Sequence, residues 1–145
     1  MQSKFLNDKQ VLVLRLDIDE EVVASILKAA EHYKIPSGIV SGIGAVNFAE
    51  IGLYDTSKKK YIKTTLREPL EIAALNGSLS KKDGSPYAHL HVVFGDSDGR
   101  TYGGHLDRAT VSATAEIFVQ INPEPIERSY SADIGLNLMA LQETL

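Results

Sequence analysis

Three of the four histidines in the sequence, His89, His91 and His105, lie in one short region and are the residues best suited to chemistry. His89 and His91 are two positions apart in a run of residues that is typical of a β-strand. Since residues two apart in a strand point to the same face of the sheet, both imidazoles can reach one ion. Neutral imidazole is the commonest metal ligand in proteins, so this pair indicates a candidate metal site.

Whether His105 joins the pair depends on the length of the turn between two strands. Residues 97–99, Ser-Asp-Gly, suit a three-residue hairpin loop whose glycine takes a left-handed backbone conformation. Asp96 then pairs with Arg100, and the antiparallel ladder places His91 directly opposite His105. Directly opposed residues share a face, with Cβ atoms about 5 Å apart. The sequence therefore predicts that all three imidazoles converge, whereas a loop with an even number of residues would turn His105 away.

Three imidazole nitrogens with one open position are the ligand pattern of a catalytic zinc site. Such a site acidifies a bound water or polarises a carbonyl group. Imidazole ligands favour Zn²⁺, with nickel, iron and copper as the alternatives. The competing interpretation is that a short His-x-His pattern arises by chance and that the rings merely fill a polar sheet face. No pairing of a nucleophile with a base is legible in the sequence, so any chemistry is expected to depend on the ion.

The elements that position these histidines are predicted to be mainly strands. Residues 11–16 form a short apolar run that predicts a strand, and apolar residues recur at helical spacing over 22–33. Asp19 is the predicted N-cap of that helix, and the two glutamates after it suit the positive end of the helix dipole. From 38 to 121, frequent turn signals predict antiparallel hairpins. The predicted strands there are 39–40, 46–54, 61–66, 70–79, 87–94, 101–106 and 110–121.

Two segments within this region predict local irregularities. Gly42-Ile43-Gly44 predicts a bulge or tight bend rather than a phosphate loop, because no helix follows it. Asp107-Arg108 predicts a two-residue turn, after which His105 would pair with Thr110. In that register Glu116 lies about 20 Å along the strand from the pair. Glu116 is therefore not expected to bind the ion within the same subunit.

Composition bounds the class of protein. The 145 residues are 43% hydrophobic and 23% charged, which is typical of a globular domain. The absence of cysteine excludes disulfides, thiolate zinc sites and cysteine nucleophiles. With no signal peptide and no apolar run near the roughly 20 residues that span a bilayer, we expect a cytoplasmic protein. We expect one α+β domain over 1–145, with its core at about 11–121 and a tail at 122–145 that packs on the body or on a neighbour.

The charged residues outside the histidine region favour structural interpretations. The net charge of −4 argues against avid binding of nucleic acid, because that affinity comes mainly from neutralising phosphates. Lysines 58–60 and 81–82 form short basic clusters at predicted turns, where solvated charges are common. Glu71 interrupts an otherwise apolar strand, which favours a structural ion pair over a functional carboxylate. His32, on the predicted helix, is expected at the surface.

Several motifs, taken together and in order, resemble the PPC domain (plants and prokaryotes conserved). They are SGIGA at 41–45, EPLEIAALNG at 68–77, HLH at 89–91 and YGGHL at 102–106 followed by 111–116, within a resemblance that runs from about Val11 to Ala140. The resemblance implies a mainly antiparallel seven-stranded sheet with one principal helix, assembled as a homotrimer. The family is similar in fold to acetolactate decarboxylase, a zinc enzyme with a His-x-His plus histidine site. That likeness carries His89, His91 and His105 over as metal ligands.

The resemblance also bears on partners. In plants such domains accompany AT-hook motifs in nuclear DNA-binding proteins, and stand-alone bacterial members are often labelled DNA-binding by association. This chain lacks the Arg-Gly-Arg-Pro core of an AT-hook. Where the plant domains carry Gly-Arg-Phe-Glu-Ile-Leu, residues 68–73 keep only Glu71 and Ile72. Both departures argue against DNA binding.

The function that follows is a trimeric protein with a three-histidine divalent metal site that acts on or senses a small metabolite. A DNA-binding module and a non-enzymatic interaction scaffold are the alternatives. If subunits meet near the ion, Glu71, Arg100, Arg108 and Glu116 are the candidates to support the site from nearby. The sequence does not name a substrate, because a fold-level likeness does not carry one.

Overall fold

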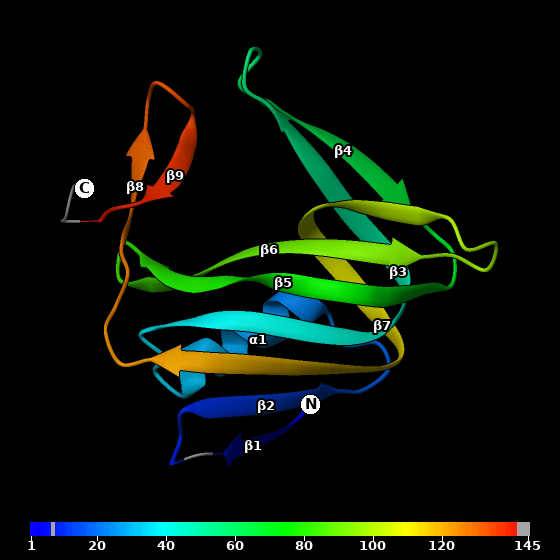
Figure 1. Ribbon diagram of the computed structural model, residues 1–145, viewed down its shortest axis with the longest axis horizontal. Helices are drawn as coiled ribbons and strands as arrows, with labels where there is room; N and C mark the ends of the chain where they lie inside the picture. The colour runs from blue at the N-terminus through cyan, green and yellow to red at the C-terminus, as the bar shows by residue number, and fades with distance from the viewer. Residues whose placement is uncertain (7, 142–145) are drawn as a thin grey trace.

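A seven-stranded antiparallel sheet with one helix on its face dominates the computed structural model, which describes residues 1–6 and 8–141 (Figure 1). The predicted α+β class and mainly antiparallel sheet are therefore confirmed. The elements in chain order are β1 (Gln2–Leu6), β2 (Val11–Leu16), α1 (Val22–His32), β3 (Ser37–Asp55), β4 (Lys60–Leu66), β5 (Leu70–Lys82), β6 (Ser85–Gly95), β7 (Thr101–Asn122), β8 (Arg128–Ser131) and β9 (Leu136–Met139). No helix in the described part of the chain is long and apolar enough to cross a membrane.

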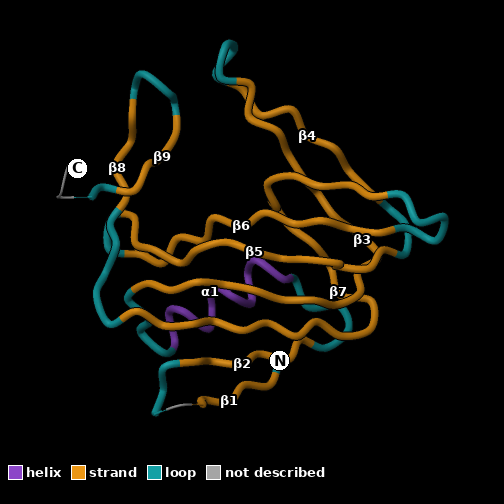
Figure 2. The backbone as a smooth tube through the Cα atoms, in the orientation of Figure 1, coloured by secondary structure: helices purple, strands orange, loops and turns teal. Residues whose placement is uncertain are grey.

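Strand β7 is the centre of the topology. The sheet has the order β1-β2-β7-β6-β5-β3-β4, with an additional pairing of β7 with β3. Residues 115–120 of β7 pair with β2, and residues 101–105 pair with β6. Because β3 pairs with both β7 and β5, and β5 pairs with β6, these four strands form a closed ring of pairings. Figure 2 shows the resulting curved sheet, with α1 behind it.

The hydrophobic core lies between α1 and the concave side of the sheet. Alternate residues of each strand point inward, so Leu90, Val92 and Phe94 of β6 are almost fully buried. The helix contributes its apolar stripe, including Val22 and Ile26, both fully buried. The opposite face of β6 therefore carries Tyr87, Val93 and the two histidines of that strand.

The turn between β6 and β7 is the predicted three-residue loop. The backbone N–H of Asp96 donates to the carbonyl of Arg100 at 3.0 Å, and Gly99 has a φ of 77°. The Asp96 carboxylate accepts hydrogen bonds from the N–H groups of Asp98 and Arg100 and from the hydroxyl of Tyr102. Desolvation is the largest single effect and raises the pKa of Asp96, but the hydrogen bonds together outweigh it and hold the pKa below its usual value. The loop is thus fixed by local contacts that fasten the register of the two strands.

The helix begins at a different cap from the predicted one. Glu21, not Asp19, is the N-cap, and its carboxylate accepts hydrogen bonds from the N–H groups of Val23 and Ala24 at 3.0 and 2.6 Å. The same carboxylate accepts a third hydrogen bond, from the N–H of Ala109 in β7, at 3.0 Å. Asp19 instead has a φ of 68°, and its N–H donates to the carbonyl of Val111. Contacts with β7 therefore decide where the helix starts.

The predicted turn at Asp107-Arg108 is wrong, because β7 continues through it as one strand. Arg108 pairs with Glu50, and His105 pairs with Gly52 rather than with Thr110. The chain bends at the predicted turn, but this bend is accommodated by register shifts in the pairing of β7 with β3. The predicted irregularity at 42–44 is confirmed as a bulge in the pairing of β3 with β5.

The tail forms an element that was not predicted. Strands β8 and β9 pair only with each other, and Figure 1 shows them standing beside one end of β5 and β6. The N–H of Lys81 donates to the carbonyl of Ile126, and the N–H of Ala140 donates to the carbonyl of Glu127. The first bond fastens the start of the β8–β9 hairpin to β5, and the second joins the two ends of the hairpin to each other. Strand β1 is a further unpredicted element.

The close pairing of β5 with β6 at Gly77 yields a prediction about stability. A Cβ added at Gly77 would collide with the carbonyl oxygen of His89 and lie 2.8 Å from the Cα of Leu90, and these backbone atoms cannot move aside cheaply. Gly77→Ala is expected to lower the free energy of unfolding by about 1–3 kcal/mol, measured by urea denaturation. Gly95→Ala, whose added methyl group meets nothing within 4 Å, is the control and should change it by less than about 0.5 kcal/mol. Equal effects of the two substitutions would contradict the packing argument.

Candidate metal centre

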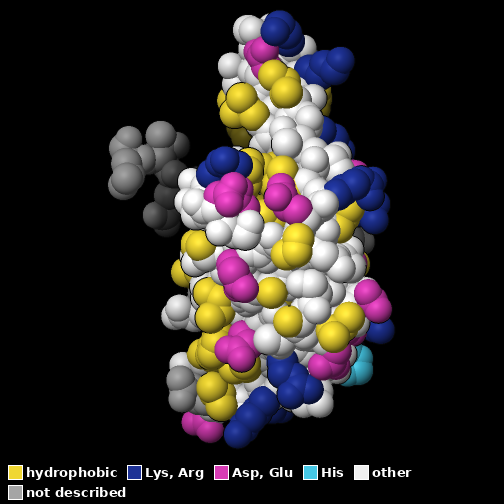
Figure 3. All heavy atoms as spheres, turned by 90° about the vertical axis from the view of Figure 1, so that its right-hand side faces the viewer, with side chains coloured by type: hydrophobic (Ala, Val, Ile, Leu, Met, Phe, Trp, Pro, Cys, Tyr) yellow, Lys and Arg dark blue, Asp and Glu magenta, His cyan; other side chains and the backbone are white. Residues whose placement is uncertain are grey.

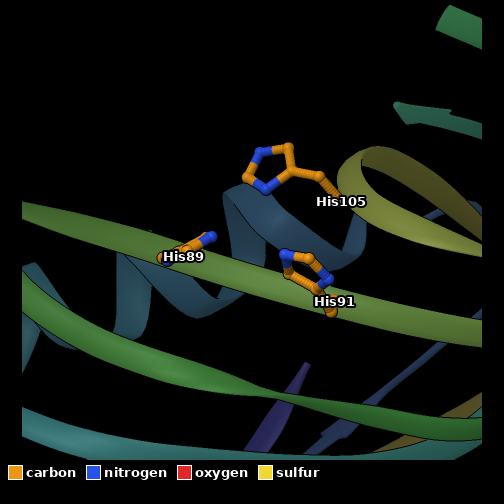
Figure 4. Close-up of side chains that lie close together, drawn as sticks. All are labelled: His89, His91 and His105. Atoms are coloured by element: carbon orange, nitrogen blue, oxygen red, sulfur yellow. The ribbon is translucent and has the colours of Figure 1, made fainter. Parts of the chain in front are cut away.

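Strands β6 and β7 bring His89, His91 and His105 together on one face of the sheet. His91 pairs directly with His105, as the turn length predicted, and His89 lies two residues along β6 on the same face. The ring centroids are 5.2 Å apart for His89 and His91, 5.4 Å for His89 and His105, and 5.8 Å for His91 and His105. Figure 4 shows the three imidazoles turned toward a common space.

The distances between the ring nitrogens suit a shared ion. One nitrogen from each ring lies within 4.8 Å of the others. In a tetrahedral zinc site with Zn–N bonds of about 2.0–2.1 Å, the ligand nitrogens are about 3.4 Å apart. Small rotations about the side-chain torsions would close that difference. The three residues are therefore placed so that they can hold one metal ion.

The surroundings of His105 also fit a metal ligand. Its Nδ1 is buried and has no hydrogen-bond partner among the described residues, while Nε2 lies 3.9 Å from Oδ1 of Asp107. Burial lowers the pKa of His105, and the opposing effect of Asp107 is smaller. The neutral form of the imidazole ring is the one that binds metal. The Asp107 carboxylate beside Nε2 favours the tautomer with the proton on Nε2, which leaves the lone pair of Nδ1 free for an ion. An unpartnered buried nitrogen has a cost that a bound ion would remove.

The Asp107 carboxylate is shared with a cation on a neighbouring strand. Lys63 of β4 places its Nζ 2.6 Å from Oδ2 of Asp107, and this contact raises the pKa of Lys63. The ring of Tyr61, also on β4, lies 5.6 Å from that of His105, and burial raises the pKa of its hydroxyl. Strand β4 therefore supplies one side wall of the site, with an aromatic ring and an ion pair.

Arg128 lies on the opposite side of the site, next to His89. Burial has the largest effect in lowering the pKa of His89, and the positive charge of Arg128 adds to it. The guanidinium is buried against the sheet, with its centre 5.0 Å from the ring centroid of Tyr87. The two walls thus differ in charge, because Lys63 has an acidic partner whereas Arg128 forms no ion pair with a described residue.

The four residues predicted to support the site lie elsewhere in this subunit. Arg100 forms an ion pair with Asp98 in the turn, and Arg108 stacks on the ring of Phe48 at 5.1 Å. Glu71 and Glu116 line a shared hollow beside the bulge of β3, with a volume of about 300 Å³. Their support of the metal site remains a prediction that depends on a neighbouring subunit.

Sequence reasoning missed Asp107, Tyr61, Lys63 and Arg128. Asp107 lies two residues after His105, which would have indicated a shared face if the strand had been predicted to continue. Tyr61 and Lys63 alternate in the predicted strand 61–66, but nothing local shows that this strand lies beside β7. Arg128 has no local signal, since it reaches the site from the tail.

Solved structures with the same fold include proteins of several organisms. A metal-containing protein from Archaeoglobus fulgidus has a TM-score of 0.84 at 38% identity, covering 97% of both chains. A "putative DNA binding protein" from Bacteroides thetaiotaomicron has a TM-score of 0.90 at 29% identity, covering 95% of this chain and 96% of that chain. A plant- and prokaryote-conserved (PPC) protein from Pyrococcus horikoshii has a TM-score of 0.85 at 30% identity, covering 99% and 97%.

A weaker likeness concerns the fold alone. A Staphylococcus aureus protein similar to α-acetolactate decarboxylase has a TM-score of 0.54 at 13% identity, over 79% of this chain and 53% of that chain. The predicted relation in fold is thereby confirmed, and nothing about activity follows from it.

Sequence relatives place the chain in a family. Two bifunctional GlmU proteins from Synechococcus strains are 33% identical over 117 residues and 36% identical over 110. These matches cover 79% and 74% of this chain but only 17% and 16% of the relatives, so the chain corresponds to a small part of each. The family model of the Plants and Prokaryotes Conserved (PCC) domain matches residues 3–122. The chain therefore belongs to the Plants and Prokaryotes Conserved domain family, which its motifs had indicated.

Proposed function

We propose that this protein binds one divalent metal ion, Zn²⁺ by preference, through His89, His91 and His105, and uses the open position to act on or sense a small metabolite. The observation that carries the proposal is the convergence of three imidazoles around the buried, unpartnered Nδ1 of His105. The metal-containing relative from Archaeoglobus fulgidus, 38% identical over nearly the whole chain, supports it.

The residues around the histidines have definable tasks under this proposal. Asp107 orients the His105 ring through its Nε2 side, and Lys63 holds Asp107 in an ion pair. Tyr61 closes one wall of the site and limits the access of water. A zinc ion bound there would supply Lewis acidity toward a carbonyl oxygen or a bound water.

DNA binding is the second function that relatives suggest, since the Bacteroides thetaiotaomicron protein carries that label. The charges of this chain favour the metal proposal instead. Lys58 and Lys63 form ion pairs with Asp55 and Asp107, and Lys59 donates to the carbonyl of Ala132. Figure 3 shows Lys and Arg side chains interspersed with Asp and Glu over the face in view. A polyanion is bound by a continuous basic surface, and the face in view does not carry one.

The proposal includes a homotrimer, as the family resemblance implies. Ile39, Ile43 and Phe118 are exposed at 57%, 57% and 44% and lie on neighbouring strands β3 and β7, where Ser41 pairs with Phe118. An apolar strip on an open sheet face is a surface that a subunit contact would cover.

Metal content is the direct measure of the proposed site. Protein purified without a nickel column is expected to contain close to one equivalent of zinc by elemental analysis, and His91→Ala should lose most of it because only two ligands remain. His32→Ala, which removes the exposed helical histidine, is the matched control and should keep the metal. Less than about a tenth of an equivalent in the wild type would end the proposal.

The role of Asp107 gives a second prediction. Asp107→Asn should weaken zinc affinity about tenfold, since carboxylates that orient a ligating histidine contribute about 10–100-fold and this contact is long at 3.9 Å. The affinity is measured by competition with a chromogenic chelator. Asp98→Asn, in the exposed turn, is the control and should leave affinity unchanged. Unchanged affinity in both variants would remove Asp107 from the site.

The oligomer is tested by light scattering. The wild type is expected to have three times the mass of one chain, and Phe118→Asp should shift it toward the monomer by placing a charge in the apolar strip. A wild-type monomer at micromolar concentration would contradict the trimer without affecting the metal site.

A further inference from the structure

Arg128 is a buried cation held in a fixed orientation at the edge of the candidate metal centre. Its Nε donates to Oγ of Ser80 at 2.8 Å and its Nη1 to the carbonyl of Asn137 at 2.8 Å, while Nη2 lies 3.4 Å from Oγ of Ser78. The ring of Tyr87 lies under the guanidinium. A guanidinium carries five N–H groups, so the described contacts leave two free.

The contacts of Arg128 place its Nη2, which keeps one free N–H, on the side of the guanidinium that is nearer to His89. Ser78 pairs with His89 across β5 and β6, and Ser80 pairs with Tyr87. Directly opposed residues share a face, so Tyr87, His89, Ser78 and Ser80 surround the guanidinium on the same side of the sheet as His91. Nη2, the atom on the Ser78 side, is therefore the end of Arg128 nearest the metal ligands.

The charge balance of the site calls for an anion at this point. Three neutral imidazoles leave the full charge of a divalent ion uncompensated, and Arg128 adds another positive charge beside it. The nearby carboxylate of Asp107 is already paired with Lys63 at 2.6 Å. No described acidic residue forms an ion pair with Arg128. Buried cations without a counter-ion are costly, so a bound anion would stabilise both charges.

A purely structural role for Arg128 accounts for only part of these contacts. Its bonds to Ser80 and to the carbonyl of Asn137 attach the β8–β9 hairpin to the sheet. Neutral donors could make the same attachment without placing a permanent charge next to His89. A planar fork of N–H groups, in contrast, is the group that best recognises a carboxylate.

We propose that Arg128 binds the carboxylate of a small ligand whose hydroxyl or carbonyl oxygen, one carbon away, reaches the metal held by His89, His91 and His105. The ligand class is therefore the small 2-hydroxy and 2-oxo carboxylates. This inference rests on the proposed metal site and adds the chemical group that selects the ligand.

Cobalt-substituted protein tests the inference, since the visible spectrum of Co²⁺ reports changes in its coordination. The wild type is titrated with lactate and with lactamide as the uncharged probe. Lactate should bind more tightly than lactamide, and Arg128→Met should weaken lactate binding about tenfold to hundredfold by removing a charge-assisted pair of hydrogen bonds. Arg67→Met, which removes an exposed arginine that stacks on Phe48, is the matched control and should bind lactate as the wild type does.

The outcomes separate this inference from the metal proposal. If the wild type takes up no cobalt, the metal proposal fails and the inference fails with it. If cobalt is bound but lactate does not perturb the spectrum at millimolar concentration, or binds equally well to Arg128→Met, only the inference is overturned. Should Arg128→Met fail to fold, the ¹⁵N–¹H resonance of the Arg128 Nε group in the zinc-loaded wild type decides. It should shift on addition of lactate and not of lactamide, and an unmoved resonance at saturating lactate overturns the inference.

Discussion

The antiparallel register of β6 against β7 is the constraint on which the candidate site depends, since it alone places His91 opposite His105. The site does not provide the energy that holds this register. On the opposite face of β6, Leu90, Val92 and Phe94 are buried against the helix, and a slip of one residue would expose all three. At roughly 1.5–3 kcal/mol for each large apolar side chain, that exposure would cost far more than any contact between imidazoles. The core thus fixes the geometry of residues that it does not touch.

Strand β7 connects the candidate site to the hydrophobic core, because the same strand takes part in both. Its first residues pair with β6 at the site, and its later residues Ala115, Ile117 and Val119 lie in the core between β2 and β3. The bulges in its pairing with β3 let one continuous strand bend between the metal site and the core. Because the strand continues, Asp107 lies on the same side as His105, and Lys63 of β4 can reach it. A turn at that point would have separated the ligand from its carboxylate.

The part of the site that sequence could predict is the part set by local rules. The convergence of His89, His91 and His105 followed from strand alternation and from the length of one turn, which the hydrogen bonds of Asp96 fix within five residues. The continuity of β7 could not be predicted in the same way, because Asp107-Arg108 has the composition of a turn and only the pairing with β3 overrides it. The N-cap was misplaced for a similar reason, since the carboxylate of Glu21 also binds the N–H of Ala109, far along the chain. Arg128 lies beyond such reasoning, because its place depends on how the β8–β9 hairpin packs against β5.

The two kinds of cation in this chain argue for different partners. Lys58, Lys59 and Lys63, in β4 and in the turn before it, are exposed. Lys58 and Lys63 already have the acidic partners Asp55 and Asp107, and Lys59 donates to the carbonyl of Ala132. Arg128 is buried, held by three acceptors and stacked on Tyr87, which fixes the direction of its remaining donors. Exposed charges suit a long backbone of phosphates, whereas one oriented guanidinium next to a metal site suits a single carboxylate. The position of one arginine therefore favours a metabolite over nucleic acid as the ligand of this site.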